Sequence, residues 1–260
     1  MSVWLCIPSK RPPEEAEKCL KLWRERGYKI ALARDQFDGV PPATHWVVMP
    51  VYPGYSIATN RLVLDVLKHE PQCDWVVLGG DDVEPDANHS AEQIARQCTD
   101  HFKALAHTYH VPWRDPDEIN SGCWSNDERI CDRIASTFGV MQPTGDRWGD
   151  KQGAYADRVC GSPWIGREFA LRINQGRGPL WHEYFHMYED EELFEVAQTL
   201  GVLWQRPDLI HYHHHWARER GRIEDMPEFL KRANSQEEWR KAKALFEQRK
   251  AMGFPGSEPL

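Results

Sequence analysis

The sequence lacks several features that mark familiar classes of protein. Its seven cysteines include no C-x-x-C pair, and their odd number favours neither a disulfide frame nor a zinc knuckle. No apolar run approaches the ~20 residues of a membrane-spanning helix. The first residues already read as a strand, which leaves no room for a signal peptide. We therefore expect reduced thiols and a soluble protein of the cytoplasm.

Charge and motif content exclude further classes. The 260 residues carry a formal net charge of −8, so no overall field attracts nucleic acid or an anionic membrane, although a local basic patch is compatible with it. There is no internal repeat. The segment from Pro8 to Pro13, after the first apolar run, contains no glycine and so lacks the phosphate loop expected of a nucleotidyltransferase. The length suits one large domain, or one domain with a tail.

The order of apolar runs predicts an α/β fold. In the first half we expect strands at residues 3–7, 28–33, 45–51 and 75–78, and helices at 12–26 and 57–69. In the less regular second half we expect helices at 88–106, 167–173 and 190–200, and extended segments at 138–142, 158–165, 202–204 and 210–215. This order favours a mostly parallel sheet flanked by helices.

The composition changes after residue 216. Residues 235–238, with the sequence SQEE, fit a capping box, and residues 239–252 follow as a highly charged terminal helix. We therefore divide the chain into a domain over residues 1–216, with halves at 1–106 and 107–216, and a charged helical extension over 217–260.

The stretch from Asp74 to Asp86, DWVVLGGDDVEPD, is the most informative in the sequence. Its apolar run predicts a strand buried on both faces. That strand would deliver Asp81 and Asp82 to the edge of the sheet where open α/β proteins bind ligands. A cation would relieve the repulsion between the two carboxylates. Alternatively, the aspartates only form a turn before Pro85.

Two other polar clusters stand out. Four consecutive acidic residues, 189–192, open an amphipathic helix and exceed what the helix dipole requires, although dipole stabilisation is the alternative explanation. The run HYHHHW at residues 211–216 would place His213 and His215 on one strand face and His214 on the other. Such histidines could bind a metal, support zinc hydrolase chemistry, or form a solvated patch.

Together, these features resemble the GT-A fold of glycosyltransferases that use a nucleotide-sugar donor. The shared features are a first strand ending in Pro8-Ser9, a strand ending in paired aspartates, and a later acidic cluster that opens a helix. The resemblance spans residues 1–216, and segments 54–61 and 161–168 resemble its donor-side and acceptor-side regions. One departure concerns the metal-binding Asp-x-Asp motif, because Gly80 replaces its first aspartate. This leaves open which carboxylate contacts the metal.

The resemblance implies a set of site residues and a cofactor. Residues 1–106 would form the nucleotide-sugar-binding half, in which the donor contacts Pro8, Ser9, Arg11, Asp35, Asn60, Arg61 and Asp81. Asp82 with His213 or His215 would bind Mn²⁺ or Mg²⁺, and His215 is favoured because it lies furthest along the strand. The metal would stabilise charge on the leaving nucleoside diphosphate. Asp190, in the acceptor half, would be the general base, as in inverting enzymes.

The acceptor is less plainly encoded. The compact layout resembles stand-alone bacteriophage enzymes, some of which glycosylate hydroxymethylated DNA bases, and the basic residues of the extension could contact phosphates. We expect a UDP-sugar donor and, as the leading acceptor, a 5-hydroxymethylcytosine-type base in DNA, extruded from any duplex. Alternatives are a cell-surface glycan or protein acceptor, a nucleotidyltransferase, and a silent binding module. Trp164 and Trp181 are candidates for stacking on a sugar.

Overall fold

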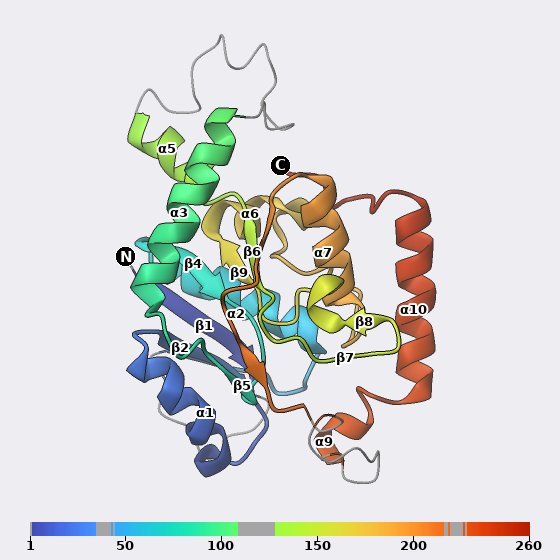
Figure 1. Ribbon diagram of the computed structural model, residues 1–260. Helices are drawn as coiled ribbons and strands as arrows, with labels where there is room; N and C mark the ends of the chain where they lie inside the picture. Colours follow the sequence, from blue (N-terminus) through green and yellow to red (C-terminus); the bar gives the residue numbers. More distant parts are fainter. Residues whose placement is uncertain are drawn as a thin grey trace.

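A seven-stranded sheet forms the centre of the computed structural model, which describes residues 2–34, 43, 45–108, 128–215, 218, 226 and 228–260 (Figure 1). Its order is β10-β6-β9-β4-β1-β2-β3. The strands are β1 (Ser2–Pro8), β2 (Lys29–Arg34), β3 (His45–Val48), β4 (Cys73–Val77), β6 (Val140–Pro143), β9 (Trp164–Gly166) and β10 (Leu203–Arg206). All pair in parallel except β9, which runs antiparallel to β4 and β6.

Helices cover the sheet, and short ribbons lie at its edge. The α-helices are α1 (Pro13–Glu25), α2 (Tyr55–His69), α3 (Ala91–Thr108), α5 (Glu128–Ser136), α6 (Arg167–Arg172), α7 (Glu189–Thr199), α9 (Glu228–Lys231) and α10 (Gln236–Ala251). Two small antiparallel ribbons pair β5 (Val83–Glu84) with β11 (Tyr212–His213), and β7 (Gly149–Asp150) with β8 (Gly153–Ala154). No helix in the described part of the chain has the length and apolar character needed to cross a membrane.

The predicted fold class is confirmed: a mostly parallel sheet flanked by helices, with a helical C-terminal tail. The antiparallel strand β9 was not predicted. The strand expected over 158–165 begins only at Trp164, because residues 158–163 form turns and bends. Likewise the strand expected over 45–51 ends at Val48, and that over 210–215 shortens to β11.

Tryptophans contribute mainly to the core. Trp4, Trp23, Trp75 and Trp164 are fully buried. The suggestion that Trp164 stacks on a sugar is therefore wrong, because its ring lies inside the sheet against Tyr28. Trp181 is half-buried, and the guanidinium of Arg249 covers its ring at 3.4 Å.

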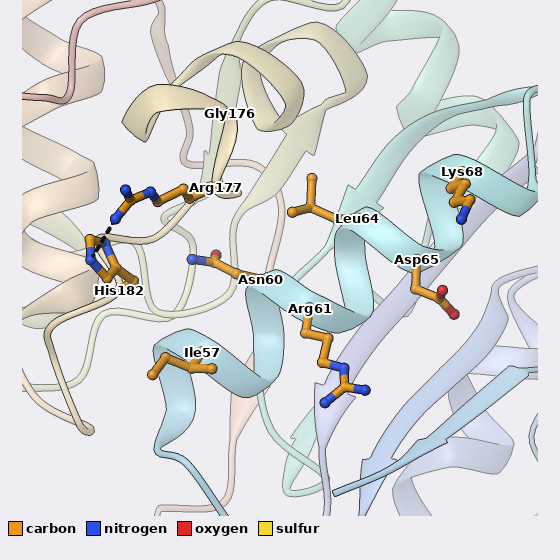
Figure 2. A pocket seen from close by; sticks show the side chains of 9 residues that line it. All are labelled: Ile57, Asn60, Arg61, Leu64, Asp65, Lys68, Gly176, Arg177 and His182. Carbon is orange, nitrogen blue, oxygen red and sulfur yellow. Dashed lines mark hydrogen bonds between the residues drawn. The ribbon is translucent and has the colours of Figure 1, made fainter.

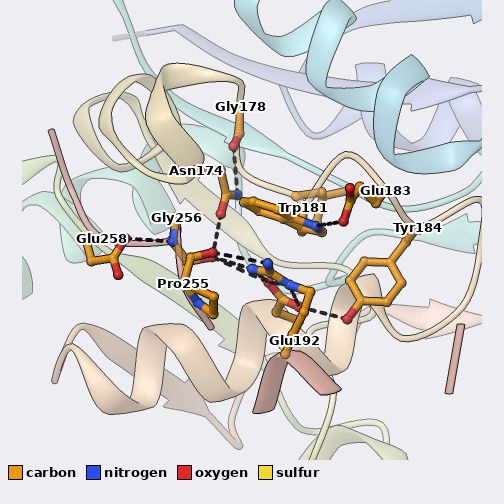
Figure 3. A network of polar contacts seen from close by, with 12 residues as sticks. Asn174, Gly178, Trp181, Glu183, Tyr184, Glu192, Pro255, Gly256 and Glu258 are labelled. Carbon is orange, nitrogen blue, oxygen red and sulfur yellow. Dashed lines mark hydrogen bonds and ion pairs between the residues drawn. The ribbon is translucent and has the colours of Figure 1, made fainter. Parts of the chain in front are cut away.

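The C-terminal helix packs back on the domain through a buried polar network (Figure 3). Ser235 caps α10, its hydroxyl accepting from the Glu238 backbone N–H at 3.3 Å, so the predicted N-cap is confirmed. The second bond of a capping box is replaced, because the Ser235 N–H donates to the Arg232 carbonyl at 3.1 Å. On the far turn, Arg249 donates to the Glu192 carboxylate of α7 at 2.7 Å, and Tyr184 donates to the same carboxylate. The extension is thus tied to the helix that carries the acidic cluster. The domain boundary at residue 216 stays a prediction.

Candidate functional site

The paired aspartates lie beside the carboxyl end of β1. Asp81 accepts hydrogen bonds from the Ser9 hydroxyl at 2.6 Å and from Arg11 Nε at 2.7 Å. The same guanidinium reaches Asp82, with Nη2 2.7 Å from Oδ2. The aspartates therefore do more than form a turn, since both bind side chains that follow another strand, next to Pro8.

A side chain on the residue before this pair would press on Asp82. A Cβ on Gly80 would lie 2.5 Å from Asp82 Oδ1, closer than real Cβ atoms approach a neighbour. The side chain of Asp82 folds back over the turn and occupies the space that an aspartate at position 80 would need. The departure from Asp-x-Asp therefore has a local steric reason.

The two carboxylates have opposite pKa shifts. Burial raises the pKa of Asp81, and this effect outweighs the opposing influence of Arg11 and Ser9. Burial also acts on Asp82, but there His213 and Arg11 together prevail and lower its pKa to about 2. Asp82 is therefore ionised at any physiological pH.

The histidine run meets Asp82 through β11. Pairing of β11 with β5 places His213 opposite Val83, and His213 Nε2 lies 3.4 Å from Asp82 Oδ1. His214 faces away and pairs with Glu84 at 2.7 Å, as strand alternation predicts. The ring of His215 lies 5.1 Å from that of His213 and 5.3 Å from that of Trp148. His213 is thus the histidine whose side chain contacts Asp82, whereas the sequence favoured His215.

The contact between Asp82 and His213 has the chemistry of a divalent metal site. Two ligands at right angles around Mn²⁺ or Mg²⁺ would lie about 3 Å apart, close to the observed separation. Among the described residues, however, no group of three or more His, Cys, Asp or Glu side chains could hold a metal ion. The protein thus offers two ligand atoms, and such a cation would need phosphate or water oxygens for its other positions.

The acidic cluster forms the N-terminus of α7. The chain enters this helix through Tyr188 at φ 70°, a left-handed conformation that is costly for a tyrosine. Glu189 is buried, and its Oε2 has no hydrogen-bond partner among the residues that the structure describes. Asp190 is half-buried and accepts from the Glu191 backbone N–H at 2.9 Å. This cluster therefore exceeds what helix capping requires.

These acids titrate abnormally. Burial, reinforced by the charge of Asp190, raises the pKa of Glu189 well above its ordinary value. Burial also raises the pKa of Asp190, while the charge of His213 acts in the opposite direction. Burial and Asp190 raise the pKa of Glu191 to about 7. The influence of His213 on Asp190 connects α7 electrostatically to the Asp82 side of the site.

Glu189→Gln is expected to stabilise the protein at neutral and alkaline pH. The pKa of Glu189 is higher in the folded protein than in the unfolded chain. Protonated Glu189 therefore stabilises the fold fully below the ordinary glutamate pKa of about 4.3, and this stabilisation is lost as the pH rises through the pKa of the folded state. Relative to the variant, the wild-type free energy of unfolding should fall by up to about 1.4 kcal/mol per pH unit in that window. Urea denaturation between pH 4 and 8 measures this. A stability difference that stays constant across the range would contradict it.

Two residues near the site were missed from the sequence. Tyr55 lies at the start of α2, and its hydroxyl donates to the Gly79 carbonyl at 3.0 Å. Burial raises the pKa of Tyr55, and the charges of Glu189 and Asp190 add to the effect, so the ring connects α7 with the aspartate turn. His186 packs edge-on against Tyr55 at 5.8 Å. Burial lowers the pKa of His186, and the charge of Asp82 acts in the opposite direction. The sequence feature that could have identified His186 is its position three residues before the acidic cluster.

His186 also belongs to a motif that sequence reasoning missed. Residues 182–186 read HEYFH, the H-E-x-x-H spacing of zinc hydrolases. That chemistry requires a helix, which places both histidines on one face, but this segment is irregular. His182 instead bonds to Arg177 at 3.0 Å, while His186 faces Tyr55. The zinc hydrolase alternative therefore has no structural support here.

Some predicted donor residues are not brought to the aspartates. Asn60 is buried, and its amide both donates to and accepts from the Leu180 backbone, at 2.6 and 3.0 Å. Arg61 is exposed and points away from Asn60, along a groove of about 540 Å³ on the outer side of α2 (Figure 2). Asp35 lies outside the described residues. The roles of these three in donor binding stay predictions.

Neither a protein-family model nor a curated protein matches the sequence. Among solved structures, the catalytic domain of Drosophila beta1,4-galactosyltransferase 7 with xylobiose is 15% identical, over 85% of this chain and 74% of its own, at a TM-score of 0.48. A mutant of that protein with manganese, UDP-Gal and xylobiose is 12% identical, over 90% and 79%, at 0.46. A glycosyltransferase involved in glycosylation of the major capsid of PBCV-1 is 10% identical, over 64% and 60%, at 0.32. Similarities of this size assign no activity to the chain.

Proposed function

We propose that this protein is a metal-dependent glycosyltransferase that moves a sugar from a nucleotide-sugar donor, a UDP-sugar, to an acceptor hydroxyl. The observation that carries the proposal is the contact of Asp82 with His213, formed between the carboxyl end of β4 and β11. This pair lies beside Ser9 and Arg11 and is linked electrostatically to Asp190 on α7. The two proposed metal ligands lie at the edge where such sheets bind nucleotides, which supports the proposal.

The reaction breaks the bond between the sugar's anomeric carbon and the diphosphate, and forms one from that carbon to the acceptor oxygen. Asp82 and His213 would hold the divalent cation, which when bound stabilises the negative charge that develops on the diphosphate. Arg11 keeps Asp82 ionised by pairing with it. Ser9 and Arg11 also fix Asp81 beside the position where the donor nucleotide would lie.

Asp190 is the proposed general base, and it removes the acceptor hydroxyl proton as the new bond forms. Its raised pKa brings it nearer the operating pH than an ordinary aspartate, which favours proton transfer. A base on the acceptor side permits direct attack opposite the leaving group, so we propose inversion at the anomeric carbon. NMR of the product determines the configuration, and an α-linked product from an α-linked donor would exclude inversion.

Asp190→Asn is expected to lower turnover by about 10²-fold or more while donor binding stays unchanged, because the amide keeps the side-chain shape but cannot accept the proton. Steady-state transfer rates and calorimetric binding of the donor measure the two effects separately. Glu195→Gln, which changes a partly exposed partner of Lys250 on the same helix, is the control and should keep both values. Parallel losses in binding and turnover would place Asp190 on the donor side instead.

The DNA-base acceptor remains a proposal with a weaker basis than the donor. Basic residues of the extension that could contact phosphates are paired with acids: Arg218 with Asp146 and Lys250 with Glu195. Such pairing reduces the positive charge available to a nucleic acid. Transfer assays with hydroxymethylated DNA and with oligosaccharide or protein acceptors, run in parallel, decide among these classes.

Thermal-shift measurements test the donor and metal together. UDP-sugars should raise the melting temperature of the wild-type protein more with Mn²⁺ than without it, because the cation bridges the protein and the diphosphate. His213→Ala should remove this metal-dependent increment, whereas His214→Ala should keep it, because the side chain of His214 pairs with Glu84 on the other side of β11. Equal increments in wild type and both variants would leave the metal site without support.

A further inference from the structure

A small cavity opens beside His213, behind the β5–β11 ribbon. Its volume is about 60 Å³, and its lining includes Gln142 of β6, Ser162, His211, His213 and Trp148. Gln142, Ser162 and His211 have no part in the metal site or the proton transfer proposed above. All three are buried, at 5%, 7% and 6% exposure, so the cavity has a polar wall inside the fold.

Hydrogen bonding fixes the state of His211. The Ser162 hydroxyl lies 3.0 Å from the Leu78 carbonyl oxygen and 2.9 Å from His211 Nδ1. A carbonyl can only accept, so the single hydroxyl hydrogen goes to Leu78, and Ser162 accepts from His211 Nδ1–H. The other ring nitrogen, Nε2, then carries a lone pair. This nitrogen is buried and has no hydrogen-bond partner within the part of the chain that the structure describes.

Gln142 supplies a second acceptor. Its side-chain Nε2 donates to the Pro143 carbonyl at 3.0 Å, which orients the amide. The remaining atom, Oε1, is buried and has no hydrogen-bond partner among the described residues. Buried polar atoms are nearly always paired in folded proteins, so two such acceptors, both on side chains that line one cavity, indicate a missing donor of hydrogen bonds.

We infer that this cavity binds a hydroxyl-bearing edge of the donor sugar. The inference rests on the proposed function, because it places the sugar next to the diphosphate held at Asp82 and His213. A sugar edge presents O–H groups, which are the donors that the two acceptors need. The volume of about 60 Å³ has room for such a group, since a hydroxyl is about the size of a water molecule. His213 lines the cavity and also contacts Asp82, which connects the two places.

Gln142→Met tests the inference, because it keeps the length of the side chain and removes the acceptor oxygen. Calorimetry would compare UDP, UDP-glucose, UDP-galactose and their monodeoxy analogues on both proteins, with Mn²⁺ present. UDP should bind both equally, which also shows that the variant folds. The preferred UDP-hexose should bind the variant about tenfold more weakly, and one monodeoxy analogue should bind both proteins alike. Gln236→Met, at an exposed position of α10 that does not line the cavity, is the matched control.

The outcomes separate the two proposals. If wild-type protein binds UDP and a UDP-hexose but Gln142→Met binds every ligand as wild type does, the cavity holds only water and the inference is overturned. An equal loss for UDP and all sugars overturns it as well, since the effect would not depend on a hydroxyl. If the wild-type protein binds neither UDP nor any UDP-sugar, the proposed function itself fails.

Discussion

Asp82→Ala is expected to lower sugar transfer by about 10³-fold and to remove Mn²⁺-dependent binding of the donor, because the cation loses its anionic oxygen ligand. Metal dependence should fall more in Asp82→Ala than in Asp81→Ala. Asp81 is hydrogen-bonded to Ser9 and Arg11, whereas Asp82 contacts His213. Transfer rates across a Mn²⁺ titration, together with binding of UDP with and without the metal, measure the effect.

Glu84→Gln is the matched control, because Glu84 lies two residues along the same turn but pairs with His214 on the other side of β11. It should retain near-normal turnover and metal dependence. Near-normal turnover of Asp82→Ala would exclude this carboxylate as a metal ligand. The diphosphate charge would then have to be countered by Arg11, which lies beside both aspartates.

Arg249→Met is expected to reduce the free energy of unfolding by about 3–5 kcal/mol. The guanidinium and the Glu192 carboxylate are only 5% and 3% exposed, so removing one partner leaves an uncompensated charge inside the protein. Both ring stacking on Trp181 and the hydrogen bond to the Pro255 carbonyl are lost as well. Denaturant unfolding measures the change.

The adjacent residue provides the control. Lys250 pairs with Glu195 one turn further along α7, but both side chains are well exposed, so Lys250→Met should cost no more than about 1 kcal/mol. A double variant, Arg249→Met with Glu192→Gln, should recover part of the loss because it removes the stranded charge. Equal destabilisation by Arg249→Met and Lys250→Met would mean that the buried pair contributes no more than a surface pair.

The sequence was sufficient where the signal is local. The apolar run before Gly79 predicted a central strand, and a strand that ends at the sheet edge brings its following aspartates there. Alternation along a strand likewise separated His213 from His214. Pro13 near the start of α1 and Ser235 before α10 marked two helix ends, because their effects act within one turn.

What could not be predicted depends on pairing between distant segments. The register of β11 on β5 decides that His213 contacts Asp82, and a shift of one residue would have presented a different histidine. Asn60 resembled a donor-binding residue, but its amide is used by Leu180, 120 positions away. The partner of Arg249 is 57 positions away on α7. No local pattern reports such partners.

The ribbon of β5 and β11 also bears on when the protein acquires its site. His214 and Glu84, which border the contact between Asp82 and His213, are separated by 130 positions. Closing so long a loop is slow and entropically costly, so this pairing belongs to the late steps of folding. During synthesis, at roughly 5–20 residues per second, the chain carries its aspartates for several seconds before the histidine strand emerges. A nascent chain that ends before residue 213 therefore has no partner for Asp82 on β11, and affinity for the donor should arise only with the last third of the chain.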